Sequence, residues 1–263
     1  MIVFLLIAAL LIIYLISIKP GKPLEDRNLR FAHRGLHDLS KGIPENSLRA
    51  FSDAVEKGFG IEIDLHMTKD GEIVVFHDDD LERICGKKGS IMETGSDEIR
   101  ELRLSGTEER IPFLSDVLSM VDGKVPILVE LKFEKSVKAI CSGVDEIMRT
   151  YSGRYYIQSF DPRCLIWYRR NRKDIKRGQL VEFFSRNGTR LNRALEYVLR
   201  SMVMNLLARP NFISYNIKDA EEALSFRIIR KLFRPRIAYW VVRDKKTVAE
   251  LQEKDHIVIF EEN

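Results

Sequence analysis

Apolar residues follow two different periods along this chain after its first 28 residues. Short runs rich in Val, Ile, Phe and Tyr alternate with longer stretches in which apolar residues recur every three or four positions. Runs of the first kind are typical of β-strands, and stretches of the second kind are typical of amphipathic helices. We predict nine strands, at residues 30–34, 60–67, 72–77, 126–132, 155–160, 177–183, 212–217, 236–242 and 256–260.

Helical stretches separate most of the predicted strands. Residues 47–58 form one of them, with Asn46 as the expected N-terminal cap and Gly58 at the end. Residues 135–150 form another, with most of their apolar side chains on one face. Strands that alternate with helices indicate a parallel sheet that is covered by helices.

Residues 60–67 and 72–77 break this alternation. Only the four residues TKDG join them, and a parallel crossover needs at least ~10 residues. The two strands must therefore form an antiparallel hairpin. Without the returning strand, eight strands and their helices remain in residues 29–263. This number of strands and this length predict a (β/α)8 barrel, the TIM barrel.

The hairpin carries an unusual number of acidic residues and histidines. Strand alternation places Glu62 and Asp64 on one face, while the apolar residues between them point to the other. If Asp70 and Gly71 form a two-residue turn, the register places Asp64 directly opposite His77. The hairpin is then expected to deliver a histidine to a pair of carboxylates.

Two carboxylates on one face of a strand repel each other unless a positive charge lies between them. Carboxylate oxygens are hard ligands, which favour Mg²⁺, Mn²⁺ or Ca²⁺ over zinc. Glu130 offers a third carboxylate near the end of another strand, and such strand ends surround the active-site mouth of a barrel. A solvent-exposed polar face on an edge strand is the alternative interpretation of Glu62 and Asp64 alone.

Four of the five histidines lie between residues 33 and 77. His33 precedes Arg34, which can clamp a phosphate with two hydrogen bonds, and Gly35, which permits close backbone approach. Together with His77 and Lys132, these side chains supply a general base, a general acid and positive charge for phosphodiester cleavage. Three histidines are assigned no catalytic role: His37, His66 and His256.

Seven short motifs occur in the order found in the glycerophosphodiester phosphodiesterase family, which this chain resembles over about residues 29–263. They are HRG (33–35), PENS (44–47), EID (62–64), TKDG (68–71), HDD (77–79), ELK (130–132) and QSF (158–160). One such motif is weakly specific, whereas seven in order are highly specific. The resemblance implies a TIM barrel with a small insertion at about residues 80–104.

The resemblance also implies metal-dependent hydrolysis of glycerophosphodiesters to an alcohol and glycerol 3-phosphate through a cyclic phosphate. It implies one divalent cation, Ca²⁺ or Mg²⁺. The residues that match the family's positions are an acid/base pair, two phosphate-binding side chains, three metal ligands and three pocket residues. The acid/base pair is His33 and His77, and the phosphate-binding side chains are Arg34 and Lys132. The metal ligands are Glu62, Asp64 and Glu130, and the pocket residues are Glu45, Phe160 and Trp240.

Three segments depart from the family pattern. Ser47 replaces a usual Thr, and either hydroxyl can serve near a helix start. The late W-T-V-N pattern reads W-V-V-R at residues 240–243, and the last strand ends in IFEEN where many relatives have Thr-Asp.

The alternatives to a glycerophosphodiester phosphodiesterase are a lysophospholipase D, a phospholipase C-like enzyme on membrane lipids, and an inactive binding barrel tethered to a membrane.

Residues 1–18 contain no charged side chain. At ~1.5 Å per residue a helix of this length covers about 27 Å, which is close to the hydrocarbon thickness of a bilayer. A signal peptide would carry a basic n-region and a small-residue cleavage site, and the sequence has neither. We therefore expect a transmembrane anchor at residues 1–18 and a linker at residues 19–28. Basic residues after the apolar run predict a cytoplasmic catalytic domain by the positive-inside rule.

The remaining features of the composition are less specific. The net charge is +4, and the basic clusters at residues 169–177 and 227–236 indicate solvated helix faces rather than nucleic-acid binding. Residues 190–207 carry a broad apolar face, which we expect to pack on the barrel, with shallow membrane contact as the alternative. Three widely spaced cysteines do not suggest a disulfide framework. No protein partner is predicted.

Overall fold

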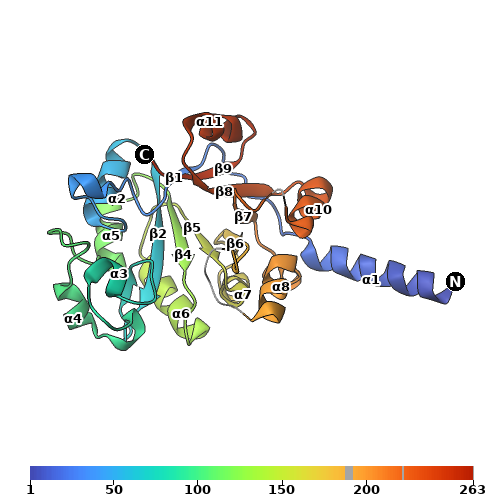
Figure 1. Ribbon diagram of the computed structural model, residues 1–263, viewed down its shortest axis with the longest axis horizontal. Coiled ribbons are helices and arrows are strands. Elements are labelled where there is room, and N and C mark those ends of the chain that lie inside the picture. Colours follow the sequence, from blue (N-terminus) through green and yellow to red (C-terminus); the bar gives the residue numbers. More distant parts are fainter. Residues whose placement is uncertain (187–191, 221, 263) are drawn as a thin grey trace.

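The computed structural model of the protein describes residues 1–186, 192–220 and 222–262 (Figure 1). Eight parallel strands form a closed ring in the order β1-β2-β4-β5-β6-β7-β8-β9, and β9 pairs with β1. This confirms the predicted (β/α)8 barrel. The strands are β1 (Arg30–Ala32), β2 (Gly60–Met67), β4 (Ile127–Leu131), β5 (Tyr155–Ser159), β6 (Arg177–Val181), β7 (Phe212–Asn216), β8 (Arg236–Val242) and β9 (Ile257–Phe260).

Helices cover the outside of the barrel (Figure 1). Strand residues such as Ile61, Ile63 and Leu65 are fully buried in the core shared by the strands and these helices. The intervening residues of β2 therefore face the interior of the barrel. The covering helices are α2 (Leu48–Glu56), α5 (Leu114–Val121), α6 (Val137–Met148), α7 (Pro162–Asn171), α8 (Arg193–Ser201), α9 (Asn205–Ala208), α10 (Leu224–Phe233) and α11 (Lys245–Glu253).

The cap of α2 differs from our prediction. Ser47, not Asn46, caps the helix, because its Oγ accepts a hydrogen bond of 3.1 Å from the backbone N–H of Ala50. Asn46 instead donates from Nδ2 to Asp64 Oδ2 at 2.9 Å. The side chain that we expected at a helix end thus contacts the acidic residues of the hairpin.

The hairpin is present, but its register differs by one residue from the predicted one. β3 (Ile73–Val75) pairs antiparallel with β2, with Leu65 opposite Val75. The turn has three residues, since Thr68 rather than Lys69 pairs with Glu72. Thr68 Oγ1 bonds both the Asp70 carboxylate and the Glu72 N–H, and this fixes the longer turn. His77 therefore follows the strand instead of lying opposite Asp64.

The segment between β3 and α5 forms a small unit with its own apolar contacts. It contains α3 (Glu82–Cys85), the 3₁₀-helix η2 (Ile91–Glu93) and α4 (Ser96–Glu101). Its apolar side chains form a cluster separate from the main core: Leu81, Ile84, Ile91, Ile99 and Leu104, together with Val74, Phe76, Ile111 and Phe113. The segment covers the predicted insertion at residues 80–104.

Residues 19–28, predicted as a linker, are bound to the barrel. The backbone N–H of Gly21 donates to Pro210 O at 2.8 Å, and that of Leu24 donates to Asn211 O at 3.1 Å. Gly21 is required for this close approach, because a Cβ there would lie 2.5 Å from Arg209 O. Leu24 is buried with Phe31 and Phe212, whose strand positions place them near the N-terminal ends of the strands.

The N-terminal apolar stretch forms the helix α1 (Ile2–Ile18), which projects from the barrel (Figure 1). Within the described part of the chain, no helix combines the length and the apolar character that crossing a membrane requires. The expected transmembrane span at residues 1–18 is therefore not supported. The helix has 17 residues, or about 25 Å at the standard rise, whereas the hydrocarbon core of a bilayer is about 30 Å thick.

The apolar face predicted over residues 190–207 is divided between two helices. Met202 adopts a left-handed conformation with φ of 57° and ends α8 before α9 begins. Residues 190 and 191 lie outside the described part of the chain.

Candidate active site

A cavity of about 670 Å³ opens at the C-terminal ends of the barrel strands. Strand ends from around the barrel converge there, as expected for this fold. Eight of the ten predicted site residues line the cavity: His33, Arg34, Glu62, His77, Glu130, Lys132, Phe160 and Trp240. The other two contact its lining, because Asp64 is bound by Lys132 and Glu45 by Arg34.

Three buried carboxylates form the floor of the site. The β2–β4 register places Asp64 beside Glu130, and Glu62 lies two residues earlier on the same face of β2. One oxygen from each carboxylate lies within 4.8 Å of the others, and the exposed fractions are 2% for Glu62, 1% for Asp64 and 6% for Glu130. An all-oxygen donor set of this kind fits a hard divalent cation.

Two basic side chains balance part of this negative charge. Lys132 Nζ lies 2.7 Å from Asp64 Oδ1 and 2.5 Å from Glu130 Oε1. Arg34 Nε lies 3.4 Å from Asp64 Oδ2. Burial opposes the ionisation of Asp64, but Lys132, His77 and Arg34 more than offset it and hold the pKa of Asp64 well below its usual range.

Glu62 has the opposite electrostatic character. Burial, followed by repulsion from Asp64 and Glu130, raises the pKa of Glu62 well above its usual range. Its Oε2 accepts a hydrogen bond of 3.2 Å from the Arg34 N–H, and Gln158 Nε2 lies 3.4 Å from its Oε1. The cluster therefore holds more negative charge than its own basic neighbours neutralise, which favours a bound cation.

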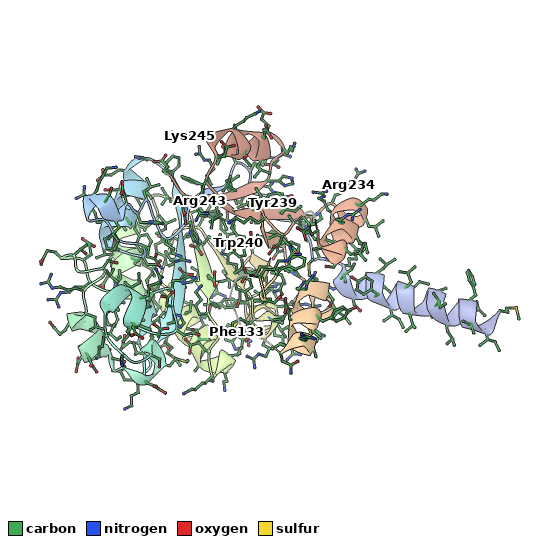
Figure 2. The ribbon with its side chains drawn as sticks, in the orientation of Figure 1. Phe133, Arg234, Tyr239, Trp240, Arg243 and Lys245 are labelled. Atoms are coloured by element: carbon green, nitrogen blue, oxygen red, sulfur yellow. The ribbon has the colours of Figure 1, made fainter. Side chains whose placement is uncertain are left out.

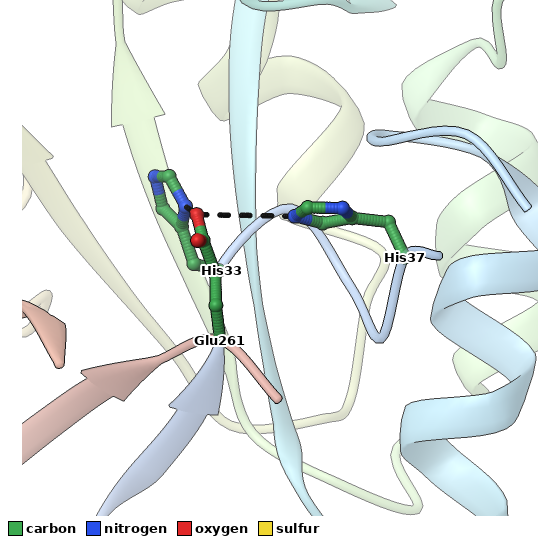
Figure 3. A group of neighbouring side chains, drawn as sticks. All are labelled: His33, His37 and Glu261. Carbon is green, nitrogen blue, oxygen red and sulfur yellow. Dashed lines mark hydrogen bonds and ion pairs between the residues drawn. The ribbon is translucent and has the colours of Figure 1, made fainter. Parts of the chain in front are cut away.

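His33 is oriented by a carboxylate that the sequence analysis did not assign to the site. Its Nδ1 lies 2.7 Å from Glu261 Oε1 (Figure 3), and Arg243 lies 2.6 Å from the other oxygen of Glu261. Burial and the nearby Arg34 lower the pKa of His33 to about 4, although Glu261 and Asp64 act in the opposite direction. His33 is thus neutral at pH 7, with its proton on Nδ1 and an unprotonated Nε2.

His77 is held by a second carboxylate. Its Nδ1 lies 2.6 Å from Asp78 Oδ1, and Arg83 Nε donates to Asp78 Oδ2 at 2.5 Å. Arg83 also donates to both oxygens of Glu45, at 2.8 and 3.2 Å, and Glu45 Oε1 accepts from Arg34 NH1 at 2.7 Å. A chain of ionic contacts therefore connects the candidate acid/base residue His77 with the candidate phosphate-binding residue Arg34.

Aromatic side chains form one wall of the cavity. The ring centroids of Phe160 and Trp240 are 5.8 Å apart, and those of Phe160 and Phe184 are 5.3 Å apart, both in edge-to-face geometry. Phe133, which follows β4, adds a partly exposed ring to the lining (Figure 2). The cavity thus combines an ionic floor with an apolar side.

The remaining histidines have structural contacts. His66 is fully buried, and its Nδ1 lies 3.0 Å from Glu134 Oε1. His37 Nε2 lies 3.9 Å from Glu261 Oε1, so His33, His37 and Glu261 form a second group of potential metal ligands. His256 packs edge-to-face on Tyr239 at the other end of β9.

Sequence reasoning missed Glu261, Asp78 and Arg83 as parts of the site. Glu261 directly follows the last strand, and side chains at that position of a barrel face the active-site mouth. Asp78 belongs to the HDD motif and is adjacent to His77. The sequence around Arg83 gives no comparable indication of a role in the site, because that role depends on how the segment after β3 folds back over the barrel.

Curated proteins resemble this chain over part of its length. A glycerophosphodiester phosphodiesterase of Caldanaerobacter subterraneus subsp. tengcongensis is 32% identical over 149 residues, which are 53% of this chain and 57% of the relative. Lysophospholipase D GDPD1 of Homo sapiens is 30% identical over 121 residues, 41% of this chain and 38% of the relative. The chain spans about half the length of the curated relatives that it matches.

Two solved structures show the same fold. A phosphodiesterase of Oleispira antarctica in complex with the product sn-glycerol-3-phosphate has a TM-score of 0.70 and 20% identity, over 89% of this chain and 93% of that one. A glycerophosphodiester phosphodiesterase of Thermotoga maritima has a TM-score of 0.65 and 26% identity, over 90% and 96%. The sequence profile of the glycerophosphoryl diester phosphodiesterase family matches residues 33–223, and the chain belongs to this family.

Proposed function

We propose that this protein hydrolyses glycerophosphodiesters to an alcohol and glycerol 3-phosphate with the help of one divalent cation. One observation carries the proposal. Two histidines with separate carboxylate partners, His33 and His77, line the same cavity as Arg34, Lys132 and the three-carboxylate cluster. This set supplies a base, an acid, phosphate-binding positive charge and cation ligands within one site.

His33 and His77 divide the proton transfers. In the first step the substrate hydroxyl next to the phosphoester attacks phosphorus, and His33 Nε2 takes its proton because Nδ1 is held by Glu261. His77 protonates the departing alcohol, which leaves a cyclic phosphate. In the second step water attacks phosphorus, the ring opens, and the two histidines exchange roles so that glycerol 3-phosphate is released.

Arg34 and Lys132 hold the phosphate oxygens. Both line the cavity and both already contact the acidic floor, so a phosphate that they bind would lie beside the carboxylates. Glu62, Asp64 and Glu130 would hold the cation, Ca²⁺ or Mg²⁺. When bound there, the cation supplies positive charge that neutralises the phosphate and the attacking oxygen.

A lysophospholipase D activity is the second candidate. The aromatic wall of Phe160, Phe184 and Trp240 offers apolar surface beside the ionic floor. Attachment to a membrane would bring lysophospholipids within reach of the active site. We propose that α1 inserts into a bilayer and that Lys19, Lys22 and the basic residues after them keep the barrel on the cytoplasmic side.

A coupled assay for choline tests the proposal, because hydrolysis releases choline from both substrates, with glycerol 3-phosphate as the other product of glycerophosphocholine and lysophosphatidic acid as that of lysophosphatidylcholine. The full chain is given glycerophosphocholine or lysophosphatidylcholine, in EDTA and after addition of Ca²⁺ or Mg²⁺. We expect cation-dependent release of choline that His77→Ala abolishes and Glu262→Gln, an exposed variant outside the cavity, leaves intact. Activity that persists in EDTA and in His77→Ala would overturn the mechanism. Absence of activity on every phosphodiester would favour an inactive binding barrel.

A further inference from the structure

Helix α1 is apolar on all sides and is largely uncovered. Large side chains from Ile2 to Ile16 are exposed by 51% or more, except for the partly buried Tyr14 and Leu15 near the barrel. In the view of Figure 2, side chains project from both edges of the helix. A helix that packs on a protein surface shows one apolar stripe, so this pattern favours an apolar medium that surrounds the helix.

A second group of exposed apolar side chains lies on α8, α9 and α10. Beyond residue 18, seven of the nine large apolar residues that are exposed in the described chain belong to these three helices. We call these seven residues the collar. The collar consists of Tyr197 and six aliphatic residues: Leu195, Val198, Leu206, Leu207, Leu224 and Leu232.

The collar is continuous with the base of α1. Asn205 Nδ2 donates to Ile18 O at 3.0 Å, which joins α9 to the end of α1. Ser225 Oγ donates to Arg200 O at 2.7 Å, which joins α10 to α8. The first bond fixes α1 to α9, the second fixes α10 to α8, and only residues 202–204 separate α8 from α9, so inserting α1 into a bilayer brings the collar to the same surface.

Charge on α10 identifies the kind of bilayer. Leu224, Ile228 and Leu232 lie one turn apart on one side of the helix, and Arg227 and Lys231 lie between them. No acidic residue occurs from Leu224 to Phe233. Lysine and arginine can lay their apolar stems along such a surface while their charged ends reach lipid headgroups. The alternation of leucine and basic residues is complementary to an interface with anionic headgroups.

We propose that the collar rests on the surface of an anionic lipid bilayer into which α1 inserts, so that the barrel is held in one orientation against the membrane. This inference depends on the proposed membrane attachment, but not on the proposed hydrolysis. The occupant of the collar is the lipid headgroup region, into which the leucines of α9 and α10 are partly immersed.

Fluorescent labels at single cysteines test this proposal. In a full chain that carries Cys85→Ser, the two remaining cysteines are buried, so an environment-sensitive dye can be attached to Leu207→Cys or Leu224→Cys. Leu39→Cys is the matched control, because Leu39 is an exposed leucine far from the collar in the chain and on a different element. With phosphatidylcholine–phosphatidylglycerol vesicles, we expect a blue shift and several-fold weaker iodide quenching at positions 207 and 224, and neither change at position 39.

The alternative outcomes are distinct. The protein's attachment to vesicles is measured separately by flotation in a density gradient. If the protein floats with the vesicles while labels at 207 and 224 behave like the label at 39, the collar proposal is wrong. A blue shift without vesicles would indicate a second copy on the collar and would also overturn it. If the protein does not float, membrane attachment itself fails, while the hydrolysis assay still decides the proposed function.

The basic residues of α10 are tested separately. Arg227→Glu combined with Lys231→Glu should weaken partition into phosphatidylglycerol-containing vesicles by roughly tenfold or more, because each basic residue near an anionic surface contributes to binding. Lys245→Glu combined with Lys246→Glu on α11 is the matched control and should leave partition unchanged. Equal partition of both double variants would contradict the role of α10.

Discussion

His33 Nδ1 and Glu261 Oε1 lie 2.7 Å apart and connect the ends of the first and last strands of the barrel. The contact exists only because the sheet closes, which places β9 beside β1. Arg243, which follows β8, holds the other oxygen of Glu261. Closure of the barrel thus selects the tautomer of a histidine in the cavity, and this relationship can be tested.

Removal of the Glu261 charge should slow the reaction with little change in KM. In Glu261→Gln the pKa of His33 falls further, and its Nε2 becomes a weaker base, because the carboxylate no longer favours the protonated ring. We expect kcat to fall by about 10- to 100-fold. Steady-state kinetics on glycerophosphocholine measure both constants.

Glu262→Gln provides the matched control for this variant. Glu262 is the next residue and forms a surface ion pair with the exposed Lys57, so the kinetics of Glu262→Gln should match those of the unchanged protein. Full activity in Glu261→Gln would show that His33 needs no carboxylate partner. An equal loss in both variants would point to a general effect on the end of β9.

The activity should persist to unusually low pH for a reaction that needs a neutral histidine. Burial and Arg34 lower the pKa of His33 to about 4 from its ordinary 6.5. The base form is therefore present above about pH 4 and is lost as the pH falls through that value. A pH profile of kcat/KM should show its acidic limb nearer to pH 4 than to pH 6.5.

The lowered pKa of His33 also affects the stability of the folded protein. Between pH 6.5 and about 4 the unfolded chain binds a proton at His33 that the folded protein does not, so this residue lowers stability as the pH falls. Histidine resonances followed by NMR would measure the pKa of His33 directly. A value near 6.5 for that ring would contradict the prediction.

Arg83 should influence both catalysis and phosphate binding, although it lies outside the barrel strands. Its guanidinium bridges Asp78, the partner of His77, and Glu45, the partner of Arg34. Because the Arg83 side chain is 49% exposed, solvent weakens these ion pairs, and we expect a moderate effect of roughly tenfold in kcat/KM for Arg83→Gln. Both kcat and KM should change, since the bridge joins an acid/base residue to a phosphate clamp.

Arg83→Lys separates charge from geometry. An ammonium cannot reproduce the paired hydrogen bonds that the guanidinium donates to each of the two carboxylates, so rescue should be partial. Arg103→Gln is the matched control in the same inserted segment, where Arg103 pairs with the exposed Glu108. Full activity in Arg83→Gln, or equal losses in Arg83→Gln and Arg103→Gln, would remove Arg83 from the site.

The sequence predicted the elements better than the contacts between them. Alternation and hydrophobic period located all nine strands, because apolar burial determines both patterns. The hairpin register was wrong by one residue, because Thr68 and Asp70 form side-chain bonds that strand alternation does not reveal. Asn46 was misplaced for a similar reason, since its amide bonds a distant carboxylate instead of its own helix.

The predicted site residues converged because they lie at strand ends, where barrel geometry brings them together. Residues that orient them were missed, since Glu261 reaches His33 only through barrel closure and Arg83 reaches Asp78 and Glu45 only through the inserted segment. Such contacts depend on packing over long sequence separations. A single sequence indicates which side chains carry chemistry more readily than which side chains hold them.

Glu62 should make the cation-free protein less stable as the pH rises. The pKa of Glu62 lies well above its ordinary value of 4.5 because of burial and the neighbouring carboxylates. Above pH 4.5 the unfolded chain therefore releases a proton that the folded protein retains, and stability falls with rising pH until Glu62 ionises. In EDTA, Glu62→Gln should lose less thermal stability between pH 5 and pH 8 than the unchanged protein.

A bound cation should reverse this effect in the unchanged protein but not in Glu62→Gln. At a cation concentration about 100 times Kd, binding adds about 2.7 kcal/mol, which corresponds to a rise in Tm of roughly 5–10 °C for a chain of this size. Glu62→Gln should lose most of this rise because it lacks one ligand. Glu72→Gln, an exposed change on the same hairpin, should keep it. Equal cation-induced shifts in all three proteins would place the cation elsewhere.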